Sequence, residues 1–166
     1  MITVRKSTLA DLPKIEEIYS FARDFMVTTH NPHQWGNNHP LTSEIIKDIK
    51  TENHYIIEKE GDILGVFSLF LDPDPTYGHV DGKWLNDEEY ATIHKIASSG
   101  KEKGVLLVAV NYALSFKNNV RIDTHDENKV MQHLLEKYGF KKCGIIYLLN
   151  GDPRIAYQLK KKNLKM

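Results

Sequence analysis

The sequence predicts an α/β protein of the mixed α+β kind, with one central mixed sheet and helices on both of its faces. Segments that alternate apolar and polar residues are interspersed with segments whose apolar residues recur every three or four positions, and this mixture predicts helices layered on a sheet. The length of 166 residues fits one domain. No internal repeat, low-complexity stretch or Gly/Ser linker divides the chain. We therefore expect residues 1–166 to form a single domain.

The first third of the chain predicts a strand, two helices and a long loop. Residues 2–5 alternate as a short strand does. From residue 12 to 26 the apolar residues recur at helical spacing, which predicts a helix of about five turns. This apolar stripe is expected in the core, together with Phe21; its members are Leu12, Ile15, Ile18, Tyr19, Ala22, Phe25 and Met26. Proline, glycine and asparagine then break the pattern over residues 28–41, so we expect a loop there before a short helix over 42–50.

Strands dominate the middle of the chain. Two alternating segments, 54–58 and 63–70, flank Glu60-Gly61-Asp62, which is a hairpin signal. A third strand is expected over residues 89–98. Residues 105–116 are apolar nearly all round, so they predict a helix that is buried on most sides.

The last third predicts a strand, a helix and a closing hairpin. Residues 120–124 form the strand, and the helix over 127–138 ends at Gly139 as a left-handed C-cap. Residues 140–149 and 154–159 are then expected to pair as antiparallel strands.

Composition excludes several classes of function. Lys+Arg and Asp+Glu are equal at 22 each, whereas proteins that bind nucleic acids usually carry a basic excess, so no nucleic-acid partner is expected. The longest apolar run, Val105 to Val110, is far shorter than the ~18 residues of a membrane-spanning helix, so no membrane association is expected. The single Cys143, together with a start that turns charged at Arg5 and Lys6, predicts a cytoplasmic protein.

A short basic loop joins the strand at 89–98 to the apolar helix at 105–116. The loop contains Lys101, Lys103 and Gly104. Free backbone N–H groups and the positive end of the dipole meet at a helix start, so such a loop suits an anion, although it also fits a solvated turn with two surface lysines. A Walker loop and a Rossmann fingerprint are both excluded, because the glycines that these motifs require are missing.

Two short motifs stand at the start of this helix and along the helix at 127–138. The pattern Arg/Gln-x-x-Gly-x-Gly/Ala aligns with residues 101–106: Gly104 matches, Lys101 is a basic stand-in, and Leu106 departs from the small residue. The pattern Asn-x6-Leu/Tyr-Glu-Lys-x-Gly-Phe matches Asn128 followed by Leu135-Glu136-Lys137-Tyr138-Gly139-Phe140. With these motifs in this order, the sequence resembles the GNAT superfamily of N-acetyltransferases over nearly its whole length.

The resemblance implies a GNAT-like fold with a mostly antiparallel, twisted sheet, and a reaction between acetyl-CoA and an amine. Acetyl-CoA, the acyl donor, would lie where the strand at 89–98 splays from the strand at 120–124. Its pantetheine arm would hydrogen-bond to the backbone around Ile96 and Ala97, and Asn128 would help to position it. Its pyrophosphate would sit on the backbone amides of Lys101, Glu102, Lys103, Gly104, Val105 and Leu106. No metal is expected.

The chemistry of such a reaction requires a base. An alkylammonium with a pKa near ~10.4 is protonated at neutral pH and cannot attack a thioester until it loses a proton. His94 is the preferred base, with Glu88 and Glu89 as alternatives; the simpler interpretation of His94 is a polar residue on a half-exposed strand. Many members of the family have a tyrosine acid where this chain has Leu135, so Tyr138 is the candidate acid, with a packing role as the alternative.

The residues that follow the strand at 120–124 lie at the open end of the predicted sheet, where ligands gather in open α/β folds. Asp123 or His125 could bind the acceptor ammonium or relay its proton, whereas Asp126 is expected to cap the next helix. The spacing of these acids and the histidine matches no standard set of metal ligands.

The loop at 28–41 supplies the other candidate contacts to the acceptor. In the GNAT superfamily this region commonly forms a wall of the acceptor pocket. The resemblance therefore implies that Gln34 and Trp35 shape this pocket by hydrogen bonding and aromatic contact, although Trp35 could equally anchor the loop to the core. The loop also carries His30, His33 and His39, but neither a cysteine nor a helical i,i+4 pair supports a zinc site.

We therefore interpret the chain as an acetyl-CoA-dependent N-acetyltransferase that acts on a primary amine of a small molecule or peptide by direct attack in a ternary complex. The alternatives are a non-catalytic acyl-CoA-binding sensor on the same fold and a module for another phosphate ligand. Homodimers are common in the resembling family, which makes a second copy of the chain a candidate partner. The sequence does not name the acceptor amine.

Overall fold

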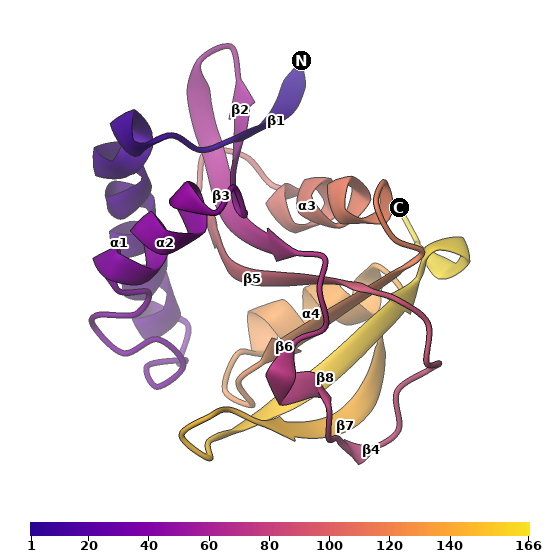
Figure 1. The fold of residues 1–166 in the computed structure, drawn as a ribbon. Coiled ribbons are helices and arrows are strands. Elements are labelled where there is room, and N and C mark those ends of the chain that lie inside the picture. The colour runs from indigo at the N-terminus through magenta and orange to yellow at the C-terminus, as the bar shows by residue number, and fades with distance from the viewer.

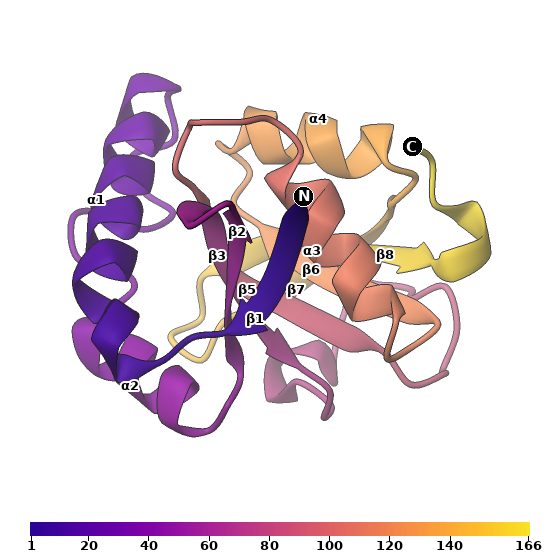
Figure 2. The same ribbon diagram turned by 90° about the horizontal axis from the view of Figure 1, so that it is seen from above.

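The computed structural model describes residues 1–166. It forms one eight-stranded sheet in the order β1-β2-β3-β5-β6-β8-β7-β4, with helices on both faces (Figures 1 and 2). In chain order the elements are β1 (Ile2–Lys6), α1 (Leu12–Thr28), α2 (Thr42–Lys50), β2 (His54–Lys59), β3 (Asp62–Phe70), β4 (Asp81–Gly82), β5 (Ala91–Ser98), α3 (Val105–Leu114), β6 (Asn119–Thr124), α4 (Lys129–Lys137), β7 (Lys141–Tyr147) and β8 (Pro153–Lys160).

The predicted fold class and order of elements are confirmed. All strand pairs are antiparallel except β5 with β6, so the sheet is mixed and mostly antiparallel. The two-residue strand β4, which pairs with β7, is the element that the sequence did not predict. Helix α4 begins two residues later than predicted, because Asn128 caps it by accepting a hydrogen bond from the backbone N–H of Met131. Gly139 ends this helix with φ +103°, as expected of a left-handed cap.

Two layers cover opposite faces of the sheet. Helices α3 and α4 pack on one face and form the main core with β2, β3, β5, β6 and β8. Helices α1 and α2 cover the N-terminal half of the other face, where they contact β2, β3 and β5 (Figures 1 and 2). On that same face the segment 71–90 covers the C-terminal strands through Tyr77, Trp84 and Tyr90. None of the helices combines the length and the apolar character required to cross a bilayer.

The phenylalanines of α1 correct one expectation. Phe21 and Phe25 are 47% and 46% exposed, so the prediction that they lie in the core is wrong. The burial expected of Ile15, Ile18, Tyr19 and Ala22 in the same stripe is confirmed, and the two phenylalanines lie on the adjacent side of the helix. The ring of Phe21 packs over Gly100 in the loop after β5, so it connects α1 to that loop.

The two central strands part after a short stretch of pairing. Strand β5 pairs with β6 only at Ala91 with Val120 and at Thr92 with Arg121. Beyond Thr92, β5 continues along β3, while β6 continues along β8 to Thr124. The expected splay between the strands at 89–98 and 120–124 is therefore confirmed.

A bulge in β5 accompanies this parting. Ser68 of β3 pairs with His94, but two residues earlier Val66 pairs with Ala97, so β5 carries one extra residue. Lys95 takes up the extra residue in a left-handed conformation with φ +53°. Successive side chains of a regular strand point to opposite faces, but because of the bulge the neighbours His94 and Lys95 both line the same cleft.

A buried chain of hydrogen bonds holds the bulge. The hydroxyl of Tyr19 donates to the carbonyl oxygen of Lys95 at 2.7 Å. The Tyr19 oxygen therefore accepts from Nε2–H of His54 at 2.9 Å, and Nδ1 of His54 accepts from the hydroxyl of Ser7 at 2.7 Å. His54 is fully buried, and burial lowers its pKa from 6.5 to about 4. Neutral His54 thus links β1, α1 and the bulge.

The titration of His54 makes stability depend on pH. Between pH ~6.5 and about 4 the unfolded chain binds a proton at this histidine and the folded chain does not, so stability rises with pH across that window. We expect the free energy of unfolding to fall by roughly 3 kcal/mol from the top of this window to its bottom on account of His54. Urea denaturation at a series of pH values measures it. The His54→Gln variant, which keeps a polar side chain without a titrating group, should show a shallower slope; an unchanged slope would contradict the assignment.

Candidate active site

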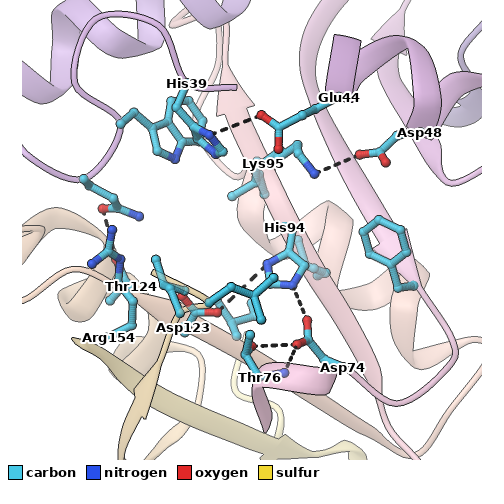
Figure 3. A pocket seen from close by; sticks show the side chains of 18 of the residues that line it. His39, Glu44, Asp48, Asp74, Thr76, His94, Lys95, Asp123, Thr124 and Arg154 are labelled. Carbon is cyan, nitrogen blue, oxygen red and sulfur yellow. Dashed lines mark hydrogen bonds and ion pairs between the residues drawn. The ribbon is translucent and has the colours of Figure 1, made fainter. Parts of the chain in front are cut away.

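An open cleft of ≈ 1030 Å³ lies over the parting of β5 and β6 (Figure 3). Its floor contains residues 93–96 of β5 and 122–124 of β6. One wall comes from α2 and the loop before it, and the opposite wall comes from residues 70–76 and from the turn between β7 and β8. The cleft therefore occupies the gap between the α1–α2 layer and the segment 71–90.

A histidine–aspartate pair stands at the centre of the cleft (Figure 3). Nε2 of His94 lies 2.7 Å from Oδ2 of Asp74. Burial alone would raise the pKa of Asp74, but the hydrogen bonds from His94 and Thr76 outweigh it and lower this pKa to about 2. Because Asp74 is ionised and accepts at Nε2, the neutral imidazole carries its proton there and leaves the lone pair of Nδ1 free.

A second carboxylate faces that free nitrogen. Oδ2 of Asp123 lies 4.0 Å from Nδ1 of His94. The hydroxyl of Tyr77 donates to the same oxygen at 2.7 Å. Burial, together with the charge of Asp123, raises the pKa of Tyr77 well above its usual value, so the phenol stays protonated as a donor. Nδ1 and the Asp123 carboxylate thus converge on one point of the cleft, where an ammonium group would meet both a base and an anion.

The wall from α2 carries a neutralised ion pair. Nζ of Lys95 lies 3.0 Å from Oδ2 of Asp48, which also accepts from the hydroxyl of Ser68 at 2.7 Å. On the same wall, Nδ1 of His39 lies 3.6 Å from Oε1 of Glu44 (Figure 3). Since Lys95 has its own carboxylate, its charge is satisfied within the protein.

The loop between α1 and α2 reaches across to the start of α4. Oε1 of Gln34 accepts from the amide nitrogens of Asn128 at 2.9 Å and Asn31 at 3.0 Å, and from the hydroxyl of Thr124 at 3.5 Å. Trp35 is buried, packs edge-on against Tyr19 with ring centroids 5.7 Å apart, and also lines the cleft. Trp35 therefore anchors the loop and shapes the cleft at once.

Comparison with known proteins identifies the fold. No protein-family model matches the sequence, and neither does any curated protein. Among solved structures, an acetyltransferase of the GNAT family from Streptococcus agalactiae is similar with a TM-score of 0.84 at 25% identity, over 99% of this chain and 96% of that chain. GNAT acetyltransferases from Listeria monocytogenes (TM-score 0.69, 19% identity, 96% and 94% covered) and Bacillus cereus (0.62, 21%, 97% and 98%) are also similar.

The chain has the GNAT acetyltransferase fold. The resemblance drawn from its sequence motifs is therefore confirmed, and the likeness extends over almost the full length of these relatives.

In this GNAT fold, the basic loop that was predicted to bind pyrophosphate lies outside the cleft, at the start of α3. Lys101 and Glu102 are exposed and pair with Asp62 at 3.6 Å and Lys59 at 3.4 Å. Lys103 is exposed as well. The two neighbouring β strands therefore hold the loop by surface ion pairs, which contribute little stability.

The first turn of α3 offers backbone amides without partners. Gly104 precedes the helix with φ +92°, and a Cβ built on it would meet no atom within 4 Å. The first helical bond runs from N–H of Val108 to the carbonyl of Gly104, so the three amides between them have no intrahelical acceptor. The side chains of Val105 and Leu106 are buried in the main core, so the bulk of Leu106 points away from this helix start.

The other predicted donor-site residues lie along the parted strand and at the start of α4. Ile96 lines the cleft, whereas Ala97 is buried against the α1–α2 layer, so only its backbone is available. Both polar atoms of the Asn128 side chain are already used, one as the cap of α4 and one in the bond to Gln34. Asn128 thus fixes the local structure beside the cleft.

Two predicted residues lie away from the cleft. Tyr138 ends α4 with its side chain buried in the main core and does not line the cleft, so its position favours packing over acid catalysis. His125 lies outside the cleft lining too; its Nδ1 accepts from the backbone N–H of Glu127 at 3.0 Å and stabilises the turn before α4. Asp123 and His94, in contrast, come together as described above.

Sequence reasoning missed the partners of these residues. Asp74 lies in the stretch Asp72-Pro73-Asp74-Pro75, which predicts only the end of a strand. Tyr77, Asp48 and Arg154 carry no local signal, because each meets its neighbours from an element distant in sequence: Asp48 and Arg154 line the cleft, and Tyr77 donates to Asp123. The one sequence feature that singles out Asp74 is its position between two prolines, outside any predicted helix or strand.

Proposed function

We propose that this protein is an acetyl-CoA-dependent N-acetyltransferase that transfers the acetyl group to a primary amine by direct attack in a ternary complex. The observation that carries the proposal is the parting of β5 from β6 beside His94, whose Nε2 is hydrogen-bonded to the ionised Asp74. The names of the similar structures from three bacteria support acyl transfer as the general chemistry.

The donor would enter from the side of α3 and α4. A pantetheine arm between the parted strands would use the backbone of Ile96 and Ala97, which β6 no longer faces. Its pyrophosphate would accept from the unpaired amides after Gly104, where the positive end of the helix dipole favours an anion. The absence of a side chain at Gly104 lets the phosphate oxygens approach the backbone closely.

The acceptor would enter on the opposite face, from the cleft. Its ammonium binds beside Asp123, and Nδ1 of His94 takes one proton from it. The resulting imidazolium is stabilised by Asp74 at 2.7 Å. The lone pair of the neutral amine then attacks the thioester carbonyl carbon, and a backbone N–H near the bulge of β5 stabilises the oxyanion.

Collapse of the tetrahedral intermediate completes the transfer. The carbonyl forms again, the C–S bond breaks, and the electron pair leaves on the sulfur of CoA. The pKa of the corresponding thiol is near ~8.5, so the thiolate is a weak enough base to depart without a proton donor. The buried position of Tyr138 is therefore compatible with turnover. The proton that remains on the product nitrogen passes to the thiolate or to solvent, and His94 returns its own proton to solvent.

Release of free thiol tests the proposal directly. The protein is incubated with acetyl-CoA and a panel of amines, and thiol is followed over time. We expect release that depends on both the amine and the enzyme. Binding of CoA without amine-dependent release would indicate an acyl-CoA sensor, and stabilisation by other nucleotides but not by CoA would indicate a different phosphate ligand.

Removal of the base should lower turnover. We expect His94→Ala to reduce kcat/KM by about 100-fold or more, the usual contribution of a positioned base. Asp74→Asn should reduce it less and move the acid limb of the pH–rate profile to lower pH, since the imidazolium loses its anionic partner. His79 pairs with Asp81 at 2.8 Å on the surface, so His79→Ala serves as the control and should keep full activity. A wild-type pH profile in His94→Ala would dismiss His94 as the base.

Substitution of Gly104 should weaken binding of the donor. Valine there is strained by the positive φ and its side chain would fill the approach to the unpaired amides, so we expect the Kd for CoA to rise about tenfold or more. Gly151 is the matched control, because it has φ +91° and equally open surroundings in the β7–β8 turn. Both valine variants should lose about 1–2 kcal/mol of stability. Calorimetric titration with CoA separates them; equal affinities would remove the start of α3 from the donor site.

A further inference from the structure

Arg154, at the start of β8, is a buried cation without an anionic partner. Only 8% of the residue is exposed. Its one hydrogen bond runs from Nη1 to the carbonyl oxygen of Pro153 at 2.8 Å, and no carboxylate lies within ion-pair distance. Arginine stays protonated in proteins, so this guanidinium keeps its charge, and its remaining N–H donors have no partner within the protein.

The other buried arginine also has no carboxylate partner, but aromatic rings and two hydrogen bonds hold its guanidinium. Arg121 lies between the rings of Trp84 and Tyr90, with distances of 4.0 and 4.1 Å to their centroids, and it donates to Gln158 and to the carbonyl of Asn86. The fold therefore provides partners for a buried guanidinium where its role is structural. Arg154 has no aromatic ring or second hydrogen-bond acceptor beside its guanidinium, only the carbonyl of Pro153, and it lines the cleft.

The sheet places Arg154 next to the catalytic candidates. Asp123 pairs with Ala156, so Arg154, two residues before Ala156 on β8, projects from the same face of the sheet. Diagonal neighbours of this kind lie about 7–8 Å apart. Figure 3 shows Arg154 with Thr124 at the edge of the cleft and His94 at its centre. A cation and the Asp123–His94 pair thus line the same cleft.

A neutral donor accompanies this cation. Oε1 of Gln34 takes hydrogen bonds from three side chains, which assigns the opposite end of the amide as Nε2. That NH2 group has no hydrogen-bond partner, and Gln34 lines the same cleft. Lys95, a half-buried cation in the same cleft, is already paired with Asp48 at 3.0 Å. Arg154 and Gln34 therefore remain as donors for an anion within the cleft, and Lys47 is an exposed cation at its rim.

We propose that the acceptor is an amine that also carries a carboxylate, as a free amino acid does, and that Arg154 binds this carboxylate. The proposal rests on the proposed N-acetyltransferase function and names its acceptor class. A planar guanidinium suits a planar carboxylate. The acids around the cleft, Glu44, Asp72, Asp74, Asp123 and Asp152, disfavour a doubly charged phosphate, and Arg154 repels the second ammonium of a polyamine. With its carboxylate on Arg154, such a substrate presents its amine to Asp123 and to Nδ1 of His94.

Pairs of acceptors that differ only in the carboxylate test the proposal. For a panel of amino acids, kcat/KM is compared with that of the methyl ester and of the decarboxylated amine. We expect the free amino acid to be preferred by about 10–100-fold, the usual effect of an ion-paired hydrogen bond. Arg154→Gln should remove most of this preference, mainly through KM, and Arg154→Lys should restore part of it. Lys47→Gln, which removes an exposed cation at the rim of the same cleft, should keep the wild-type ratio.

A preference for polyamines or esters in the wild type, or an equal loss for both members of each pair in Arg154→Gln, would overturn the proposal. A direct binding measurement tests the carboxylate site separately from the proposed acetyltransferase activity. The hydroxy acids that correspond to the best amino acids carry the carboxylate but no reactive amine, so their affinity in the presence of CoA needs no turnover. Affinity lost in Arg154→Gln supports the carboxylate site even without acetylation, and affinity unchanged in a variant with the wild-type Tm contradicts it.

Discussion

The incomplete pairing of β5 with β6 is the constraint on which the rest of this structure depends. After Thr92 the two strands follow different neighbours, so the backbone of β5 loses the hydrogen-bonding partner that a continuous sheet would give it. Unpaired backbone groups are stable only where water or a ligand satisfies them. The bulge at Lys95 fixes this geometry, and the buried chain from Ser7 through His54 and Tyr19 holds the bulge in place.

Charge in the cleft is divided between groups that the protein satisfies and groups that it leaves available. Lys95 and Asp48 neutralise each other, and Asp74 is matched by His94 and Thr76. The guanidinium of Arg154 has no such partner, and Asp123 receives only the hydroxyl of Tyr77 at hydrogen-bond distance. A ligand that carries both an ammonium and a carboxylate complements these two remaining charges, which connects the geometry of the sheet to the choice of acceptor.

The sequence predicts the order of the elements because strand alternation, helical spacing and the cap at Gly139 are local properties. It also places His94 and Asp123 near one another, since both belong to the two strands that part. It does not predict the bulge, which shifts the phase of β5 and turns Lys95 into the cleft. Helical spacing predicts the buried face of α1 at Ile15 and Ile18 but not the exposure of Phe21 and Phe25. Asp74 lies outside any regular element and Arg154 fits an ordinary strand pattern, so their roles emerge only when distant segments meet.

A structure determined with bound CoA would test the central claim most directly. The account predicts the pantetheine arm between β5 and β6 beyond Thr92, hydrogen-bonded to the backbone of β5, with the sulfur beside the cleft that holds His94. Density for CoA elsewhere on the protein, or strands that pair along their whole length in that crystal, would contradict it.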